Sequence, residues 1–311
     1  MLLSFLPKNR KKRRVVYAAI GVVLCILSIM GVLIGLLGGP GGFDSNDLRR
    51  LSSGHSCVRC DLTGASLWAE NLNGRDLRGA ILINANLWWT DLGNADLSGS
   101  DMSRANFWWS DLPGTILDNA KLEWTVLGRA VADGARFVGA DLNNADLSGT
   151  TLSQADLTSA NLFRANLLQV IAKNTKLVDA NLDEANLHLG QFAGADLSGV
   201  SLIRAAITRA DFVGAKMTDA VVTDANLSET NLSDGRLDGA DFSGSRLPNA
   251  TFANASLVGV KFVGSSLWAV DFSGADLTDA DFTDAAMPDV VMTGSRLCRT
   301  KLPSGEDTSG C

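Results

Sequence analysis

The chain has 311 residues, a net charge of −7, two histidines and one tyrosine. Because histidine is the usual acid–base group near neutral pH, so few of them argue against a His-dependent enzyme. Residues 1–43 carry six basic and no acidic side chains, which leaves about −13 on residues 44–311. An acidic body disfavours a nucleic-acid backbone as its partner.

The first forty residues predict a membrane anchor. An uncharged run of 23 residues, Val15 to Leu37, follows a basic cluster at Lys8–Arg14. As a helix this run would be roughly 34 Å long, enough to cross a bilayer core. We therefore predict a basic cytoplasmic tail over residues 1–14 and one transmembrane helix over residues 15–37. Since basic residues stay on the cytoplasmic side, the remainder is expected on the extracytoplasmic side of a bacterial cell (inner) membrane.

A cleaved signal peptide is the alternative for this run. Its apolar region would be about 7–15 residues long and would end at a small-x-small site. The run here is longer, and no clear Ala-x-Ala follows it. Gly31 and Gly35 stand four residues apart within it, a spacing that would let two such helices pack as a weak homodimer.

Residues 38–60 are expected to form a Gly-rich linker and a capping helix. Residues 38–42 contain four glycines and one proline, the composition of a flexible hinge. The segment from Ser45 to Ser53 is typical of a short helix, with Asp44 or Ser45 as its N-cap. We expect this helix to cover the open end of the region that follows.

That region repeats every five residues. From Leu62 to Leu302, 47 of 49 fifth positions hold Leu, Phe, Met, Ile or Val, and only Ala132 and Ala172 depart. The residue two places earlier is nearly always small, and Asp or Asn commonly lies between. A helix repeats at 3.6 and a strand at 2, so neither explains a period of five. Two inward residues around one outward residue, followed by a two-residue turn, indicate a solenoid.

The turn residues and the aromatic residues support four sides per coil. The second turn place holds 17 Gly, 7 Asn and 7 Asp in 49 quintets, residues that tolerate the positive φ of a type II turn. Trp68, Trp88 and Trp108 are spaced by 20, as are Phe252 and Phe272. Like residues that stack in adjacent coils would produce this spacing, so each coil should contain four quintets.

The quintet, for example Ala95-Asp96-Leu97, resembles the motif of the pentapeptide-repeat family, Ala-(Asp/Asn)-Leu-x-x. The resemblance covers about residues 61–302 and implies an all-β fold, a right-handed quadrilateral β-helix, here preceded by one transmembrane α-helix. The 49 quintets make about 12 coils, and at ~4.8 Å per coil the rod would be roughly 55–60 Å long. Residues 303–311 are left as a C-terminal tail.

Tryptophans mark one corner of the first three coils as a candidate partner-binding site. They occupy outward turn places, and Trp268 stands on the same line much further along. Exposed aromatic side chains often mark a partner site or a membrane interface. The alternative is that the indoles only stack on one another and shield the corner. The candidate residues are Trp68, Trp88, Trp89, Trp108 and Trp109.

Four cysteines are candidates for disulfide bonds in an extracytoplasmic compartment. Cys57 and Cys60 fall on inward places, and a bond between them would fasten the capping helix to the first coil. Cys298 and Cys311 could likewise pin the tail. The alternatives for the first pair are a redox role, for which no βαβ context is present, and a zinc site with His55 as a third ligand but no fourth.

The charged residues of the repeat suggest no chemistry of their own. Glu70 and Arg75, at inward places of adjacent quintets, are expected to pair or to bend outward. One face carries a line of mixed charges one coil apart, from Asp76 to Arg296, which is typical of a self-compensating surface. No phosphate loop, metal-ligand spacing or nucleophile elbow is found in the sequence. No catalytic residue, cofactor or metal is therefore expected.

These observations predict a non-catalytic, membrane-anchored scaffold that binds an unidentified protein and no nucleic acid. The alternative function comes from the resemblance. Some pentapeptide-repeat proteins mimic a DNA duplex and bind a DNA topoisomerase such as gyrase. The anchor and the mixed-sign face argue against this alternative here.

Overall fold

The structure is a computed structural model that describes residues 42–311. The expected cytoplasmic tail, residues 1–14, and the expected transmembrane helix, residues 15–37, lie outside the described residues. Within residues 42–311, no helix is long and apolar enough to cross a bilayer. The described part begins with α2, Ser45–Ser52, whose N-cap is Asp44. The Asp44 carboxylate accepts a 2.7 Å hydrogen bond from the Asn46 amide, which satisfies a free donor of the first turn.

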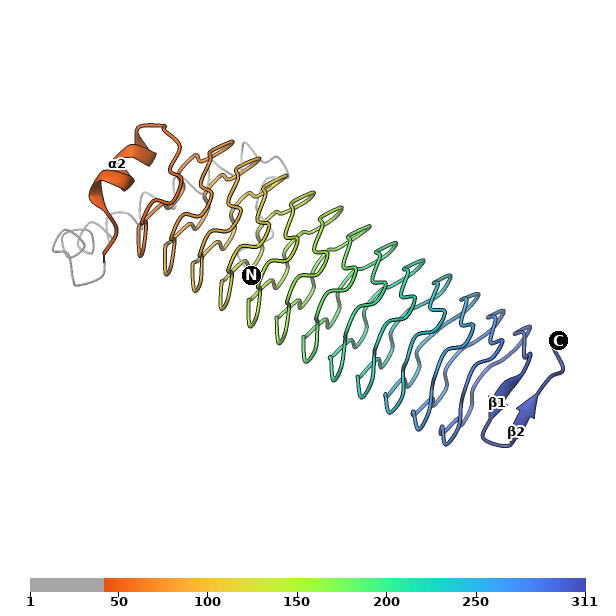
Figure 1. Cartoon of the computed structure of the whole chain (residues 1–311). Helices are drawn as coiled ribbons and strands as arrows, with labels where there is room; N and C mark the ends of the chain where they lie inside the picture. The colour runs from red at the N-terminus through yellow and green to blue at the C-terminus, as the bar shows by residue number, and fades with distance from the viewer. Residues whose placement is uncertain (1–41) are drawn as a thin grey trace, which may run out of the picture. The chain divides into compact units, whose positions relative to one another are not determined.

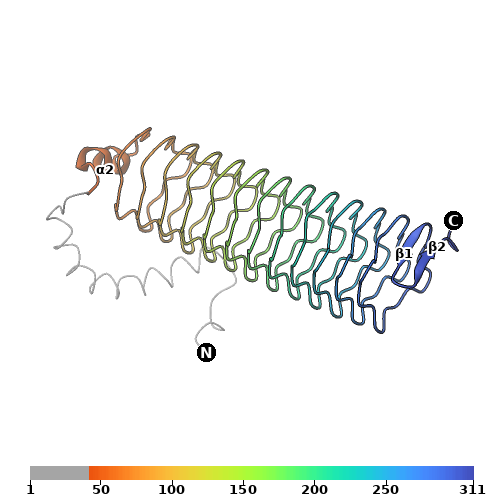
Figure 2. The same cartoon turned by 60° about the horizontal axis from the view of Figure 1, so that its bottom comes forward.

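After α2 the chain winds into a four-sided β-helix (Figure 1). The outward residue of each side forms a parallel bridge with the residue 20 places later, from Asp61–Ile81 through to Asp281–Lys301. One coil is therefore four quintets, as expected from the spacing of the aromatic residues. Figure 2 shows that the coils follow one another without a break from α2 to the C-terminal hairpin.

Every corner of the β-helix has the same backbone conformation. The second turn place has a positive φ in each quintet from Arg59 to Arg299, close to +60° at nearly all of them. The corner is closed by a backbone bond such as that donated by the Ala65 amide to the Leu62 carbonyl, 3.0 Å. This conformation explains why Gly, Asn and Asp are enriched at the place, because they adopt it at the lowest cost.

The core consists of ladders of identical or similar side chains, one from each coil. Leu residues fill it near α2, and Phe residues concentrate in the later coils. Phe242 and Phe262 stack at 5.3 Å, and Phe262 and Phe282 at 5.1 Å. Buried hydroxyls are satisfied across coils, as when Thr90 donates to the Leu67 carbonyl at 2.7 Å. Few buried side-chain polar groups of the described residues are therefore left unpaired.

Both ends of the stack are covered. At the first end Leu51 of α2 is buried on the core, and the Asp47 carboxylate accepts a 2.9 Å bond from the Asp61 amide. At the other end β1, Thr300–Leu302, pairs antiparallel with β2, Gly305–Asp307. Two boundaries differ from the expected ones. Coil geometry begins at Cys57 rather than at residue 61, and the tail after residue 302 contains a strand.

Candidate functional site

Five tryptophans form one continuous surface, which we call the Trp corner: Trp68, Trp88, Trp89, Trp108 and Trp109. Because one coil takes 20 residues, the same corner recurs above itself and brings these side chains together. The ring centroids of Trp68 and Trp88 are 6.3 Å apart, and those of Trp88 and Trp108 are also 6.3 Å apart. Trp88 stacks on Trp89 at 5.7 Å, and Trp108 meets Trp109 edge-on at 6.4 Å.

The Trp corner ends in the fourth coil at Gly128, which follows Trp108 in the ladder. A Cβ at Gly128 would lie only 3.0 Å from Trp108 Cδ1, so the Trp108 indole lies against the glycine backbone. Arg129 extends beside it, and its guanidinium carbon is 5.5 Å from the centre of the Trp109 ring. A cation in this position is attracted by the face of the indole. Neither Gly128 nor Arg129 was a candidate from the sequence, because each contacts a tryptophan of the preceding coil and not of its own.

The indoles are only partly shielded by one another. Trp108 is 42% exposed, whereas the other four are half-buried. Two indole nitrogens, Trp68 Nε1 and Trp88 Nε1, are buried and meet no acceptor among the described residues. A buried indole N–H normally donates to a partner, and leaving it unpaired costs about 1–3 kcal/mol. The Trp corner thus has more donors than acceptors.

The two remaining tryptophans stand apart from the Trp corner. Trp268 lies on the same line, ten coils beyond Trp68, and is 48% exposed. Trp124 lies on a different corner and is the most exposed tryptophan, at 56%. It was not singled out from the sequence, because no tryptophan stands next to it or 20 residues before or after it. The structure therefore shows one cluster and two isolated indoles.

The first cysteine pair is joined by a disulfide between Cys57 and Cys60. The bond closes the first corner on itself and does not link α2 covalently to the coil, because both cysteines belong to one turn. The attachment of α2 is noncovalent: the Cys57 sulfur lies 3.5 Å from the Asp47 carbonyl oxygen. Asp47, not His55, stands beside the pair, with ligand atoms within 4.8 Å of both sulfurs. His55 instead lies on Ser53, with Nδ1 2.9 Å from the hydroxyl oxygen.

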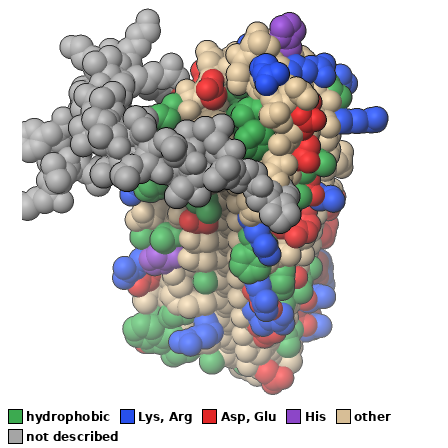
Figure 3. Space-filling model, turned by 90° about the vertical axis from the view of Figure 1, so that its left-hand side faces the viewer, with side chains coloured by type: hydrophobic (Ala, Val, Ile, Leu, Met, Phe, Trp, Pro, Cys, Tyr) green, Lys and Arg blue, Asp and Glu red, His purple; other side chains and the backbone are tan. Residues whose placement is uncertain are grey.

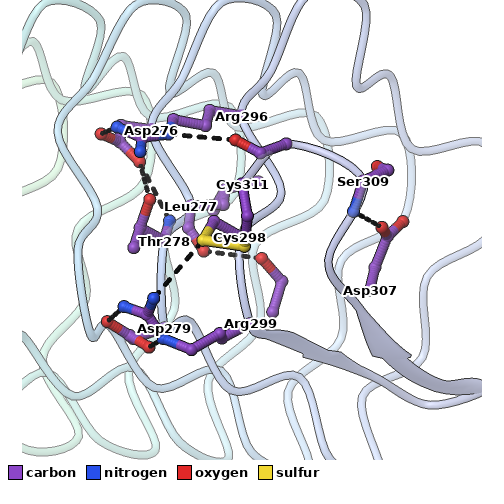
Figure 4. Close-up of a disulfide and its surroundings, with 12 residues drawn as sticks. Asp276, Leu277, Thr278, Asp279, Arg296, Cys298, Arg299, Asp307, Ser309 and Cys311 are labelled. Carbon is purple, nitrogen blue, oxygen red and sulfur yellow. Dashed lines mark hydrogen bonds and ion pairs between the residues drawn. A yellow bond between two sulfur atoms is a disulfide. The ribbon is translucent and has the colours of Figure 1, made fainter.

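The second pair, Cys298 and Cys311, is also joined by a disulfide, shown in Figure 4. The bond holds the chain terminus against the last coil, where the Gly310 amide donates to the Leu297 carbonyl at 2.7 Å. Arg296 donates to the Gly310 carbonyl at 3.3 Å, and Arg299 forms two 2.6 Å bonds to Asp279. The four cysteines thus lie at the two ends of the β-helix.

Charged side chains are paired along the axis of the rod. Lys216 lies 3.5 Å from Asp196, and Arg209 lies 2.9 Å from Glu229, each pair 20 residues apart. Glu184 accepts from Arg204 and Arg164 in the coils above and below, and these bonds hold the pKa of its carboxyl below the usual value. Figure 3 shows acidic and basic side chains intermingled on the end face that carries α2. Carboxylates of this kind are structural partners of the basic residues in neighbouring coils.

Arg75 has a different role from the one expected. Its side chain donates to the Gly54 carbonyl, in the loop that follows α2, and no ion pair with the exposed Glu70 is found among the described residues. Arg75 Nε is buried without an acceptor there. The arginine therefore holds the capping loop on the first coil.

Comparison with known proteins agrees with this architecture. A family model for pentapeptide repeats, in eight copies, matches residues 60–199 and 262–302 in overlapping segments. A second model, for a pentapeptide repeat region, matches residues 185–262. No relative of the chain was found among the curated proteins.

Several solved structures are similar to this chain. HetL, a pentapeptide repeat protein involved in heterocyst differentiation regulation in the cyanobacterium Nostoc, is 24% identical; the match covers 83% of this chain and 96% of HetL, with a TM-score of 0.43. A trypsin-treated variant of QnrB1, a plasmid-mediated fluoroquinolone resistance protein, is 20% identical over 62% of this chain and 92% of its own, with a TM-score of 0.38. A pentapeptide repeat protein from the thylakoid lumen of Arabidopsis thaliana is 25% identical over 47% and 66%, with a TM-score of 0.14.

Proposed function

The chain belongs to the pentapeptide repeat family, and from this premise we propose that it is a membrane-anchored, non-catalytic interaction scaffold. In this proposal residues 15–37 span the cell (inner) membrane once, with the N-terminus in the cytoplasm. The right-handed β-helix is displayed on the extracytoplasmic side. Its regular outer surface offers the binding sites, and the partner is a protein.

The two disulfides carry the proposal. Disulfides form and persist in oxidising compartments, and they are rare in the cytosol, where thiols are kept reduced. Here they join Cys57 to Cys60 and Cys298 to Cys311, at opposite ends of the β-helix. The presence of these two bonds supports a β-helix that folds outside the cytoplasm. The basic residues that precede the apolar run support the same location independently.

The surface of the rod supports binding of a protein rather than mimicry of DNA. A DNA mimic needs an uninterrupted row of unpaired negative charges, since a duplex carries one charge per ~1.7 Å of its axis. In this β-helix many carboxylates lie against a lysine or arginine of the next coil, as in Asp156–Lys176 at 3.9 Å and Asp241–Lys261 at 3.7 Å. Such pairs break the row of negative charge that mimicry requires.

The location is tested with C-terminal fusions of the full chain in a bacterial host. A fused alkaline phosphatase, which is active only when oxidised outside the cytoplasm, is expected to be active, and a fused green fluorescent protein is expected to be dark. A variant in which Lys8 and Arg10–Arg14 are replaced by Gln is the matched control for orientation. A fluorescent, phosphatase-inactive result for the unaltered chain would overturn the proposal and favour the DNA-mimic alternative.

The partner is sought by crosslinking native membranes and purifying the tagged full chain. A scaffold should capture a protein at constant ratio, and this capture should survive high salt if packing dominates the contact. Purification of the tagged chain alone, at every crosslinker length, would argue against an interaction scaffold.

A further inference from the structure

One side of the third and fourth coils carries exposed apolar and aromatic side chains close together. Asn106 and Val126 occupy its outward places in these adjacent coils and form a parallel bridge. Trp108 lies at one corner of this side and Trp124 at the other. Trp108 is 42% exposed, Trp124 56% and Val126 38%. Exposed apolar groups gathered in this way often mark a site of interaction.

Two arginines border the same side without a carboxylate partner among the described residues. Arg104 lies one coil before Trp124 in the same corner ladder, and Arg129 lies at the opposite corner. Further along the ladder of Arg104, by contrast, Arg204 lies 2.6 Å from Glu184. The guanidinium groups of Arg104 and Arg129 are therefore available to an anionic group, and charge-assisted bonds from arginine are among the stronger ones.

The local charge of this side differs from that of the rod as a whole. Over the third and fourth coils the side and its two corners carry Arg104, Glu123 and Arg129, so that +2 and −1 leave +1. The chain as a whole has a net charge of −7. An acidic ligand would therefore meet a favourable charge here, and an unfavourable one over most of the acidic rod.

The polar groups in the middle of this side are donors. The Asn106 carboxamide oxygen accepts a 3.0 Å bond from the Trp108 amide, and its NH₂ group meets no acceptor among the described residues. On the same side in later coils this group is used, since Asn166 donates to Asp146 at 3.0 Å. A carboxamide NH₂ carries two donors, so Asn106 can bind an acceptor on a ligand. We call this surface the donor patch; it consists of Arg104, Asn106, Trp108, Trp124, Val126 and Arg129.

An extended, proline-rich segment matches the donor patch in its chemistry. Proline has no backbone N–H, so such a segment offers carbonyl acceptors and few main-chain donors. In the polyproline II conformation its backbone makes no internal hydrogen bonds, and its carbonyls stay available. The conformation is preformed, so that docking on aromatic side chains costs little entropy. An acidic residue in the segment would complement the two arginines.

The width of the donor patch suits a short segment of this kind. The Trp108 indole lies against Gly128, which follows Trp124 by four residues. Four residues span at most roughly 13–14 Å. Because polyproline II rises ~3.1 Å per residue, about five residues reach from one indole to the other. One segment can therefore contact both rings.

We propose that the donor patch binds an extended, proline-rich and acidic segment of the partner protein. Prolines of the segment pack on Trp108 and Trp124, its carbonyls accept from Asn106, and its carboxylates pair with Arg104 and Arg129. The inference deepens the proposed function and rests on it, because it names the chemistry of what the scaffold binds. All groups of the donor patch belong to residues 104–129.

Fluorescence anisotropy of labelled peptides with the purified full chain tests this binding. The probe is a peptide of four Pro-Pro-Glu repeats. A peptide of four Gly-Ser-Glu repeats has the same charge without the preformed conformation, and a peptide of four Pro-Pro-Lys repeats keeps the conformation and reverses the charge. The Pro-Pro-Glu peptide is expected to bind at least about tenfold more tightly than either control.

Substitutions in the donor patch locate the binding. Trp108→Ala and Trp124→Ala should each weaken it about tenfold, as truncation of an aromatic anchor commonly does. Trp268→Ala is the matched control, since this indole is 48% exposed in a distant coil, and it should have no effect. Arg104→Ala should weaken the binding several-fold. Arg236→Ala, on the opposite side of the β-helix and without an ion pair among the described residues, should not.

Circular dichroism checks that each variant keeps the fold. Binding of the Pro-Pro-Glu peptide that Trp108→Ala and Trp124→Ala leave unchanged would overturn the inference. Equal binding of all three peptides would do the same. Binding of an anionic oligosaccharide such as an oligogalacturonate, but of no peptide, would assign the donor patch to a glycan and also overturn it.

The crosslinking experiment on native membranes, repeated with Trp124→Ala, separates this inference from the proposed function. Capture of a protein that is lost in the variant and in the presence of excess Pro-Pro-Glu peptide supports both. Capture that neither change affects, together with no binding of the peptide, overturns the inference and leaves the scaffold function intact. Absence of both capture and peptide binding overturns both.

Discussion

At the scale of single residues, the backbone conformation at the corners of the β-helix restricts residue type most strongly. The second turn place is left-handed in every quintet from Arg59 to Arg299, yet three of these places hold tryptophan. A left-handed conformation costs a non-glycine residue about 1–2 kcal/mol. At Trp89 and Trp109 contacts with neighbouring indoles offset that cost. Trp124 makes no ring contact with another residue of the described part of the chain, so its corner is the clearest place to measure the cost.

Replacing Trp124 by glycine is expected to give a more stable protein than replacing it by alanine. The residue has φ +59°, so glycine relieves backbone strain that alanine keeps, while both variants lose the same buried part of the indole. Because glycine also makes the unfolded chain more flexible, its advantage over alanine should be about 0.5–1 kcal/mol. Chemical denaturation of the full chain, followed by circular dichroism, measures it.

Trp124→Ala is the matched control, since alanine removes the indole but keeps the strained conformation. It should be no more stable than the parent chain. A glycine variant that is no more stable than the alanine variant would show that left-handed strain is absent at this corner.

At the scale of elements, α2 and the β1–β2 hairpin cover the two ends of the core ladders. In a solenoid each coil contacts only its neighbours, so an uncovered end frays locally. The Cys298–Cys311 bond encloses a longer loop than the Cys57–Cys60 bond, with sequence separations of 13 and 3. In the chain-entropy account, the longer loop contributes about 3 kcal/mol and the shorter about 2 kcal/mol.

Reducing both disulfides should therefore loosen the C-terminal end more than the end that carries α2. Hydrogen exchange of the full chain is expected to speed up over β1, β2 and the last coil. Exchange at the Phe242 and Phe252 amides should change little, because they donate to the Lys261 and Asp271 carbonyls, outside the last coil. Mass spectrometry of peptides before and after reduction measures the difference.

The double variant Cys298→Ser, Cys311→Ser separates this effect from that of the reductant. It should reproduce the faster exchange of the C-terminal end without any reducing agent. Uniform loss of protection along all coils would contradict local fraying and would indicate that the rod unfolds as one unit.

At the scale of the whole molecule, the 20-residue coil places charged side chains of adjacent coils next to one another. Hydrogen bonds from Arg299 hold the pKa of Asp279 below its usual value, and bonds from Thr283 and then Lys301 do the same for Asp281. A carboxyl whose pKa is lowered by folding stabilises the native state above its unfolded pKa. That stabilisation disappears as the pH falls through the native pKa.

Stability is therefore expected to be flat from pH 7 to about 5 and to fall below about 4, where unfolded carboxyls begin to bind protons. The urea midpoint of the full chain, measured at a series of pH values, gives this profile. Glu184→Gln removes one titrating group that accepts bonds from Arg204 and Arg164, so its acid limb should be shallower. A midpoint that already falls between pH 7 and 5 would mean that other groups control the acid unfolding.

The sequence alone determined the repeat and its geometry, because a period of five admits neither helix nor ordinary strand. It also placed α2 and singled out the five residues of the Trp corner. Only the tertiary structure decided which residues contact one another across coils. The coil brings Trp108 onto Gly128, Thr90 onto the Leu67 carbonyl, and Asp47 rather than His55 beside Cys57. These contacts join residues of different coils or of the cap. Such contacts depend on the packed register of the chain, and a local sequence pattern does not specify them.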